Sequence, residues 1–174
     1  MGNDNLGKSA EKKIQEWLDR PEAGYDFQRI PDQMTGFYGS SNICDFVLYK
    51  YPYHYWIESK ATWESRFEFS RLTDTQYNGL LAKSNISGVY GVVIVLFASH
   101  KRAILMDIKQ IKSMIDSGKK SINIDKIDKW DFRYSEIPTI SNNRKKLLDY
   151  AGKFEDIFET AVCNFDPTIR NESE

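Results

Sequence analysis

The segment that most constrains the fold is residues 89–97, whose sequence is VYGVVIVLF. It is almost entirely apolar and rich in β-branched side chains, without the alternation of polar and apolar positions found in a half-exposed strand. This pattern predicts a strand that is buried on both faces. A strand of that kind requires a layer of helices on each side, so we expect an α/β fold in which helices cover the central part of a mixed sheet.

The first third of the chain is predicted to supply one helix and three strands. Apolar residues recur at helical spacing over residues 8–19, and Pro21 ends the pattern. A short strand is expected at residues 27–30. Strand-forming residues at 43–49 and 53–60 flank a short turn, which predicts an antiparallel hairpin.

A capping box marks the start of the next helix. Thr73 is followed three residues later by Gln76, a spacing at which each side chain can cap the backbone N–H of the other residue, so a helix is predicted from there to about residue 83. Further elements follow from apolar periodicity and helix-breaking residues: a strand at 102–106, a helix at 107–117 capped by Asp107 with Ile108, Ile111 and Ile115 facing the core, and a helix at 144–163.

Composition excludes several classes of protein. The 174 residues suit a single domain, and a hydrophobic content of 41% is enough for a core. A net charge of −1 provides no overall basic field, so nucleic-acid binding would depend on a local basic patch. The two cysteines and two histidines lack the spacing of zinc ligands. The sequence shows neither a signal peptide nor an apolar run long enough to cross a bilayer, so we expect a cytoplasmic protein without membrane contacts.

An acidic residue stands two positions before a lysine at three places, residues 11–13, 58–60 and 107–109. Residues two apart on a helix do not share a face, which excludes the first place as a paired site. At the third place, the preceding buried strand supplies no second acid, and the aspartate already serves as a helix cap. At the second place, Glu58 and Lys60 lie on the same face of a strand, because side chains alternate along it.

A second carboxylate, Asp45, begins the other strand of the same hairpin. The start of one antiparallel strand lies near the end of its partner, so Asp45 is expected beside Glu58 and Lys60. Mg²⁺ typically takes one or two protein carboxylates, and a lysine can orient water or stabilise charge on a phosphate. The three residues therefore meet the requirements of a metal-dependent phosphodiesterase. The alternative is a polar sheet rim with an exposed ion pair worth about 0–1 kcal/mol.

Four other residues near this pair each allow two interpretations. Glu11 lies at the edge of the apolar stripe of the first helix, where a glutamate is either solvated or faces a nearby metal site. Gln76 is most simply the capping-box glutamine, and a contact with substrate or water is the alternative. Trp63 and Phe67, in the irregular segment after Lys60, either pack in the core or contact DNA.

The spacing of the acidic residues and the lysine resembles that of the PD-(D/E)xK nuclease superfamily. More specifically, it is similar to the RecU family of Holliday junction resolvases, which are found in Gram-positive bacteria and their phages. The similarity runs from about residue 7 to residue 138. The motifs that carry it are Glu11, Cys44-Asp45-Phe46, Ile57-Glu58-Ser59-Lys60-Ala61-Thr62, and the segments 67–76, 91–97 and 120–122.

The resemblance implies a restriction-endonuclease-like αβββαβ core with a mixed central sheet, followed by a C-terminal helical extension at about residues 141–165. The 174 residues would form one nuclease domain. The family members are homodimers that bind branched DNA and hydrolyse its strands at four-way junctions during recombination or repair, with Mg²⁺ as cofactor and Mn²⁺ as a substitute. Carried over by position, Asp45 and Glu58 would bind the metal, Lys60 would activate or orient the attacking water, Glu11 would be an accessory acid, and Gln76 matches a family glutamine.

The sequence departs from the family at two places. A short, nearly uncharged segment at residues 29–41 replaces the family's long basic stalk, and Ile43 stands where the family tends to have a threonine. The alternative functions are therefore a restriction, repair or flap nuclease of the same fold, or a non-catalytic DNA-binding module. Six basic residues flank the motifs and are candidates for a DNA-binding face: Lys8, Lys12, Lys13, Arg66, Arg71 and Lys83.

Overall fold

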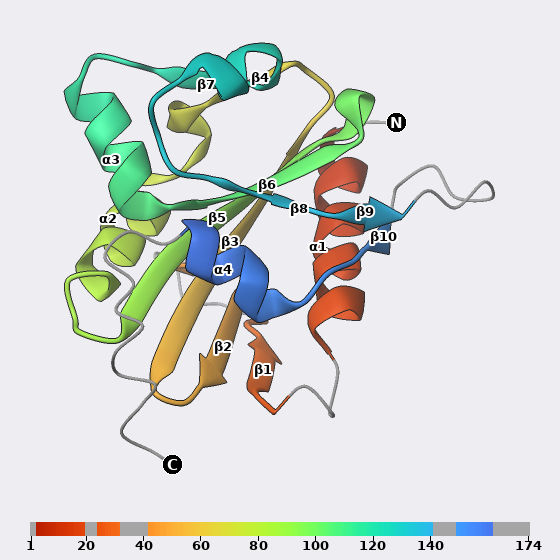
Figure 1. Ribbon diagram of the computed structural model, residues 1–174, viewed down its shortest axis with the longest axis vertical. Helices are drawn as coiled ribbons and strands as arrows, with labels where there is room; N and C mark the ends of the chain where they lie inside the picture. The colour runs from red at the N-terminus through yellow and green to blue at the C-terminus, as the bar shows by residue number, and fades with distance from the viewer. Residues whose placement is uncertain (1–2, 20–23, 32–41, 141–148, 162–174) are drawn as a thin grey trace, which may run out of the picture.

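The computed structural model describes residues 3–19, 24–31, 42–140 and 149–161 (Figure 1). Its helices are α1 (Asn3–Leu18), α2 (Asp74–Lys83), α3 (Ile108–Asp116) and α4 (Phe154–Ala161), and its 3-10 turns are η2 (Phe69–Arg71), η3 (Ala98–His100) and η4 (Ile124–Lys129). The strands are β1 (Asp26–Arg29), β2 (Phe46–Lys50), β3 (Tyr53–Thr62), β4 (Arg66–Glu68), β5 (Val89–Phe97), β6 (Arg102–Asp107), β7 (Ser121–Asn123), β8 (Ser135–Ile137), β9 (Thr139–Ile140) and β10 (Asp149–Tyr150).

Six strands form the central sheet in the order β1-β2-β3-β5-β6-β8. The pair β3 and β5 is parallel, and all the other neighbours in this sheet are antiparallel, so the sheet is mixed as predicted. Parallel neighbours need a crossover, and α2 lies in the connection between β3 and β5 (Figure 1). The order α1, β1, β2, β3, α2, β5 confirms the expected αβββαβ core.

Strand β5 is buried on both faces, as its sequence predicts. Residues 92–97 are each at most 3% exposed. Val92, Ile94 and Leu96 belong to the hydrophobic cluster that includes residues of α1 and α4. The intervening side chains of β5 belong to a second cluster, which includes residues of α2 and α3. The two faces of the sheet are therefore each covered by a pair of helices.

Helix α1 begins earlier than the sequence pattern suggested, at Asn3 rather than near residue 8. Leu6 is buried, and it lies one turn before Ala10 on the same apolar stripe, so burial extends the helix toward its N-terminus. The predicted helix at 107–117 is confirmed as α3, capped by Asp107, whose side chain accepts a hydrogen bond from the backbone N–H of Lys109.

Two predictions in the second half of the chain are wrong. Ile115 is 38% exposed, because α3 packs with Met114 toward the core. The C-terminal helix α4 covers only Phe154–Ala161, and Asp149–Tyr150, expected to be helical, pair with β9 as a strand. The sequence also gave no indication of the short strands β4, β7 and β8. The predictions for residues 141–148 and from 162 onward, and for the stalk-replacing segment beyond residue 31, lie outside the described residues.

Gly91 provides a test of how α2 sits on the sheet. A Cβ atom there would lie 2.6 Å from the carbonyl oxygen of Leu80 and 2.9 Å from Oγ of Ser84, both at the C-terminal end of α2. We expect Gly91→Ala to lower the free energy of unfolding by about 1–3 kcal/mol, because the helix has to move. Gly7→Ala is the control: a Cβ there meets no atom within 4 Å, and alanine favours the helix. Urea unfolding compares the two, and equal stabilities would contradict the packing.

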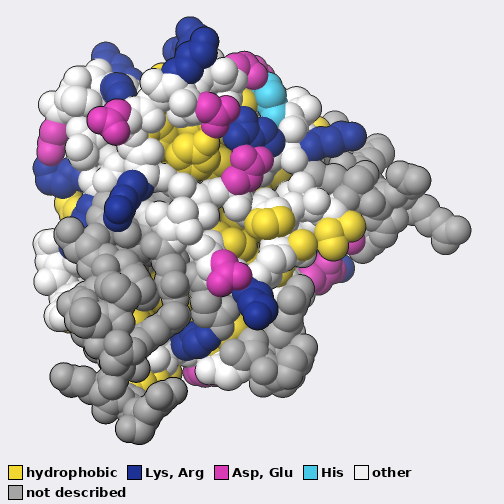
Figure 2. Space-filling model, viewed as in Figure 1, with side chains coloured by type: hydrophobic (Ala, Val, Ile, Leu, Met, Phe, Trp, Pro, Cys, Tyr) yellow, Lys and Arg dark blue, Asp and Glu magenta, His cyan; other side chains and the backbone are white. Residues whose placement is uncertain are grey.

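In the part of the chain that the structure describes, no helix is long and apolar enough to cross a membrane. The face that carries α4 bears lysine and arginine side chains interspersed with aspartate and glutamate (Figure 2). Among the described residues of this face, the mixture forms no continuous basic patch of the kind that DNA binding needs.

Candidate active site

Asp45 is held in place by the strands on either side of it. Its backbone N–H donates to the carbonyl of Ile57 at 3.1 Å, and its own carbonyl accepts from the N–H of Ile30 at 2.7 Å. The pairing of Phe46 with Ile57, continued by one residue, places Asp45 opposite Glu58. The Asp45 carboxylate (Oδ2) accepts a hydrogen bond from the backbone N–H of Ser59 at 2.7 Å. Hydrogen bonds to neighbouring strands thus fix both the backbone and the carboxylate of Asp45.

Glu58 is the most deeply buried acid of the site, with 1% of its surface exposed. Its Oε1 lies 2.7 Å from Nζ of Lys60 and also accepts a short hydrogen bond from Nε2 of Gln76. Its Oε2 is buried and has no hydrogen-bond partner among the described residues. An acceptor left unpaired in the protein interior is costly, so this oxygen is available to a ligand.

Gln76 takes part in the capping box and in the site at the same time. Its backbone N–H donates to Oγ1 of Thr73, and its Oε1 accepts from the Thr73 N–H at 3.1 Å, which confirms the predicted capping box. The same Oε1 accepts from Nζ of Lys60, also at 3.1 Å. The first turn of α2 is therefore locked onto the two charged residues of β3, and the two interpretations of Gln76 do not exclude each other.

Burial and nearby negative charge both favour the protonated carboxyls at this site. Desolvation, followed by the negative charge of Asp45, raises the pKa of Glu58 to about 8, although Lys60 acts in the opposite direction. Desolvation is also the largest cause that raises the pKa of Asp45, to about 6, and its hydrogen bond from the Ser59 N–H lowers it. If both carboxyls were ionised, they would carry more negative charge than Lys60 alone neutralises, so a cation bound between them would favour the ionised forms.

Glu11 reaches the site from α1. Its negative charge raises the pKa of both Asp45 and Glu58, which places it in their electrostatic neighbourhood. Its Oε2 lies 2.9 Å from Nη2 of Arg29, and Arg29 in turn lowers the pKa of Asp45. The structure thus brings together the five residues singled out from the sequence and adds Arg29, which lay in a short strand without any recognisable motif.

The donor set fits a hard divalent cation. Among the residues that the structure describes, no group of three or more His, Cys, Asp or Glu side chains is arranged to hold a metal. Mg²⁺, however, usually takes only one or two protein carboxylates and keeps water on its other positions. The carboxylates of Asp45 and Glu58 meet that requirement, since both are oxygen donors and Glu58 has a buried Oε2 without a partner.

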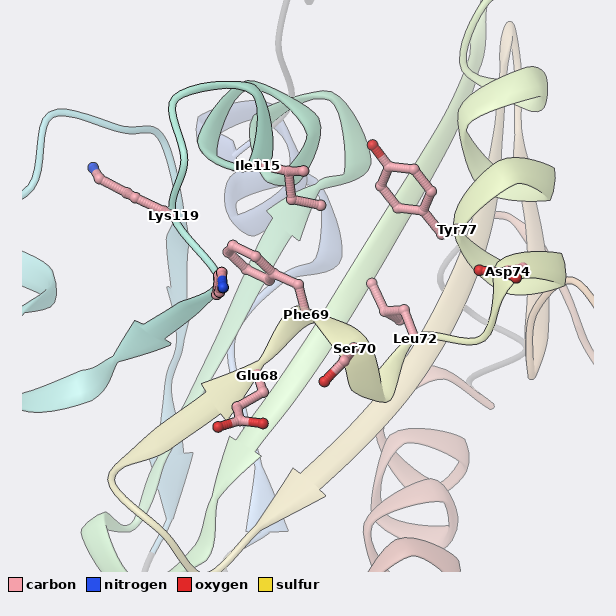
Figure 3. A pocket seen from close by; sticks show the side chains of 9 residues that line it. Glu68, Phe69, Ser70, Leu72, Asp74, Tyr77, Ile115 and Lys119 are labelled. Atoms are coloured by element: carbon pink, nitrogen blue, oxygen red, sulfur yellow. The ribbon is translucent and has the colours of Figure 1, made fainter.

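Two pockets flank the segment of β4 and η2 that follows the site, and both are lined in part by Glu68. One, of about 400 Å³, is shown in Figure 3, where the side chains of Phe69, Tyr77 and Ile115 point toward one another and Lys119 points away. The other, of about 570 Å³, contains Trp63 and two arginines. The sequence makes both Trp63 and Phe67 candidates for DNA contact. Phe67 is fully buried and belongs to the core, whereas Trp63 is only partly buried.

An αβββαβ core that carries two carboxylates and a lysine at one end of its hairpin has the arrangement of the PD-(D/E)xK nuclease superfamily. The family model described as RecU, recombination protein U, matches residues 28–156, and the chain belongs to this family.

Among solved structures, the chain is similar to Hjc of Archaeoglobus fulgidus, a Holliday junction resolvase from an archaeal hyperthermophile. The two are 17% identical, with a TM-score of 0.43, over 60% of this chain and 78% of the Hjc chain. No curated protein sequence matches the chain significantly.

Proposed function

We propose that the protein is a divalent-metal-dependent endonuclease that cleaves four-way DNA junctions. The observation that carries the proposal is the buried carboxylate of Glu58, which lies opposite Asp45 and is bound by Lys60 and Gln76. One of its oxygens has no hydrogen-bond partner among the residues that the structure describes. A buried acid with a raised pKa beside a second acid is typical of a functional site rather than of a stabilising ion pair. Membership of the RecU family supports the choice of substrate.

The carboxylates of Asp45 and Glu58 would hold the cation, Mg²⁺ or Mn²⁺. When bound, the cation would acidify a water molecule and neutralise charge on the phosphate. The backbone N–H of Ser59 keeps the Asp45 carboxylate oriented, and Gln76 does the same for Glu58. Binding a cation would also relieve the repulsion that raises the pKa of both acids.

Lys60 would position the attacking water and stabilise negative charge as a cation. Its ammonium has three N–H donors and no acceptor. Glu58 and Gln76 take two of the donors, and 18% of the side chain is exposed. The third donor can therefore point toward the substrate. Because a charged ammonium cannot accept a proton, Lys60 acts here by orientation and charge and not as the base.

The test compares labelled four-way junctions with linear duplexes and flaps of the same sequence, in Mg²⁺, in Mn²⁺ and in EDTA. We expect cleavage of the junction in either metal, at least ~10-fold faster than cleavage of the duplex, and none in EDTA. Preferential cleavage of flaps or linear duplex would contradict the proposed junction specificity and would indicate a nuclease with another substrate. DNA binding without cleavage of any substrate would favour a non-catalytic module.

A four-way junction has two strands to cut, so we propose that the active form is a homodimer with one site per protomer. The mass measured by light scattering after size-exclusion chromatography should be about twice the chain mass of 20.3 kDa. A mass that stays at one chain both with and without junction DNA would contradict the dimer.

Gln76→Ala is expected to slow cleavage by about 10–100-fold, because Glu58 and Lys60 lose the side chain that orients them. Thr73→Ala is the matched control: it also weakens the capping box, at a cost of about 1 kcal/mol, but it leaves the contacts of Gln76 with the site intact. Single-turnover rates and unfolding curves of both variants separate the two roles. Equal cleavage rates for the two variants would mean that Gln76 serves only as a cap.

A further inference from the structure

The pocket of about 570 Å³ lies directly beyond the proposed cleavage site along β3. Thr62, which lines it, is the last residue of β3 and shares a face of the strand with Glu58 and Lys60, because side chains alternate. The volume of the pocket is within the range of roughly 300–1,000 Å³ that is usual for sites that bind small organic molecules. The pocket therefore begins two residues beyond Lys60, on the face of β3 that carries the proposed cleavage site.

The walls of the pocket are held in place by contacts of the protein itself. The guanidinium of Arg71 donates a hydrogen bond to the carbonyl of Ala61 at 2.8 Å and lies 5.6 Å from the ring centroid of Phe67, which is fully buried. The hydroxyl of Thr62 accepts from the N–H of Glu64 at 3.1 Å, which fixes the turn after β3. The part of the wall formed by Arg71 and the turn after β3 is therefore ordered before a ligand binds, which favours affinity.

The pocket combines three kinds of chemistry. Arg66 is exposed and makes no hydrogen bond or ion pair with any described residue, so its guanidinium is free to bind a phosphate together with Arg71. Glu64 and Glu68 place carboxylates on the wall, and these can accept hydrogen bonds from the amino groups of a base. Trp63 is partly buried and offers an aromatic surface.

We propose that this pocket binds one unstacked nucleotide of the DNA strand, adjacent to the phosphate that is cleaved. A free phosphate would be repelled by the two carboxylates, and a purely apolar ligand would make no use of the charged side chains that line the pocket. A nucleotide suits both the positive and the negative side chains of the pocket. Its phosphate would bind the arginines, and its base would contact the carboxylates and the indole of Trp63. This inference rests on the proposed function, because the nucleotide must belong to a strand bound at the Glu58 site, and it adds a contact that selects DNA whose bases can open, as at a branch point.

The test maps the contact directly by photocrosslinking. Four-way junction, duplex and single-stranded DNA, each with one 5-iodouracil at a different position around the cleaved bond, are irradiated in complex with the protein in EDTA, and the crosslinked residue is identified by mass spectrometry. We expect an adduct on Trp63 from one or two adjacent positions of the junction and a much weaker one from duplex. Adducts confined to other residues, or no adduct from a bound DNA, would overturn the inference.

Binding of the same DNA by variants provides the second measurement. Arg66→Ala removes a side chain that makes no hydrogen bond or ion pair with any described residue, so the fold should be unaffected. We expect the variant to bind the junction with a dissociation constant about 10-fold higher than that of the wild type. Arg133→Ala, another exposed arginine outside the pocket, is the matched control and should bind as the wild type does. Equal affinities for all three proteins would overturn the inference. If the protein cleaves duplex instead of junctions, the proposed substrate fails, but an adduct on Trp63 would still support the pocket.

Discussion

Replacing Asp45 with asparagine is expected to slow DNA cleavage by about 10³-fold or more in saturating Mg²⁺. The substitution keeps the shape of the side chain and its hydrogen bond from the N–H of Ser59, but it removes one of the two anionic ligands proposed for the cation. Because asparagine keeps the packing of this partly buried side chain, the fold should be unaffected. Single-turnover cleavage of a labelled four-way junction gives the rate constant, and circular dichroism checks the fold.

Asp116→Asn is the control for that substitution. Asp116 is an exposed residue at the end of α3 that pairs with Lys112 on the same helix, so its replacement should leave cleavage at the wild-type rate. Metal-dependent cleavage at the full rate by Asp45→Asn would show that the assignment of the active site is wrong. A partial loss that higher Mg²⁺ concentrations restore would show that Asp45 contributes to affinity for the cation and not to the chemical step.

Stability of the protein in EDTA is expected to fall by a few kcal/mol between about pH 5 and pH 8, since each unit of pKa shift corresponds to about 1.4 kcal/mol. Burial raises the pKa of Glu58 from 4.5 to about 8 in the folded state. Within that interval the folded protein holds a proton that the unfolded chain releases, so the folded state binds more protons and loses stability as the pH rises. Asp45, raised from 3.8 to about 6, adds to the lower part of the interval.

Urea unfolding at a series of pH values measures this slope, and Glu58→Gln is the decisive comparison. Glutamine has the same size but does not titrate, so the variant should be less sensitive to pH and more stable than the wild type at about pH 8 in EDTA. Added Mg²⁺ should stabilise the wild type and not the variant. A wild-type stability that rises with pH over this interval would mean that the buried carboxyl is not protonated in the folded state.

The core of the fold could be predicted because its patterns are local. The apolar run of β5 has only one arrangement that buries it, between two layers of helices, and the capping box of Thr73 and Gln76 is formed by residues three apart in sequence. The elements that were missed depend on distant partners. Strand β4, for example, exists because it pairs with β7, more than 50 residues later, and its own sequence has no regular period.

The site was predictable to the extent that strand geometry determines it. Alternation along β3 and the hairpin register place Glu58, Lys60 and Asp45 together, and both rules can be applied to a sequence. The burial of Glu58 and its unpaired oxygen could not be predicted, because they depend on how α2 packs against the sheet. The pairing of Glu11 with Arg29 could not be predicted either, since it joins a helix to a strand edge across the tertiary structure.

The most direct test of the central claim is the position of Mn²⁺ in crystals of the protein, located by anomalous scattering. The proposal predicts a peak bound by the carboxylates of both Asp45 and Glu58 in the wild type, and its loss in Asp45→Asn. A protein that requires Mn²⁺ to cleave DNA, yet binds it at other residues and leaves this pair of carboxylates without metal, would contradict the proposed active site.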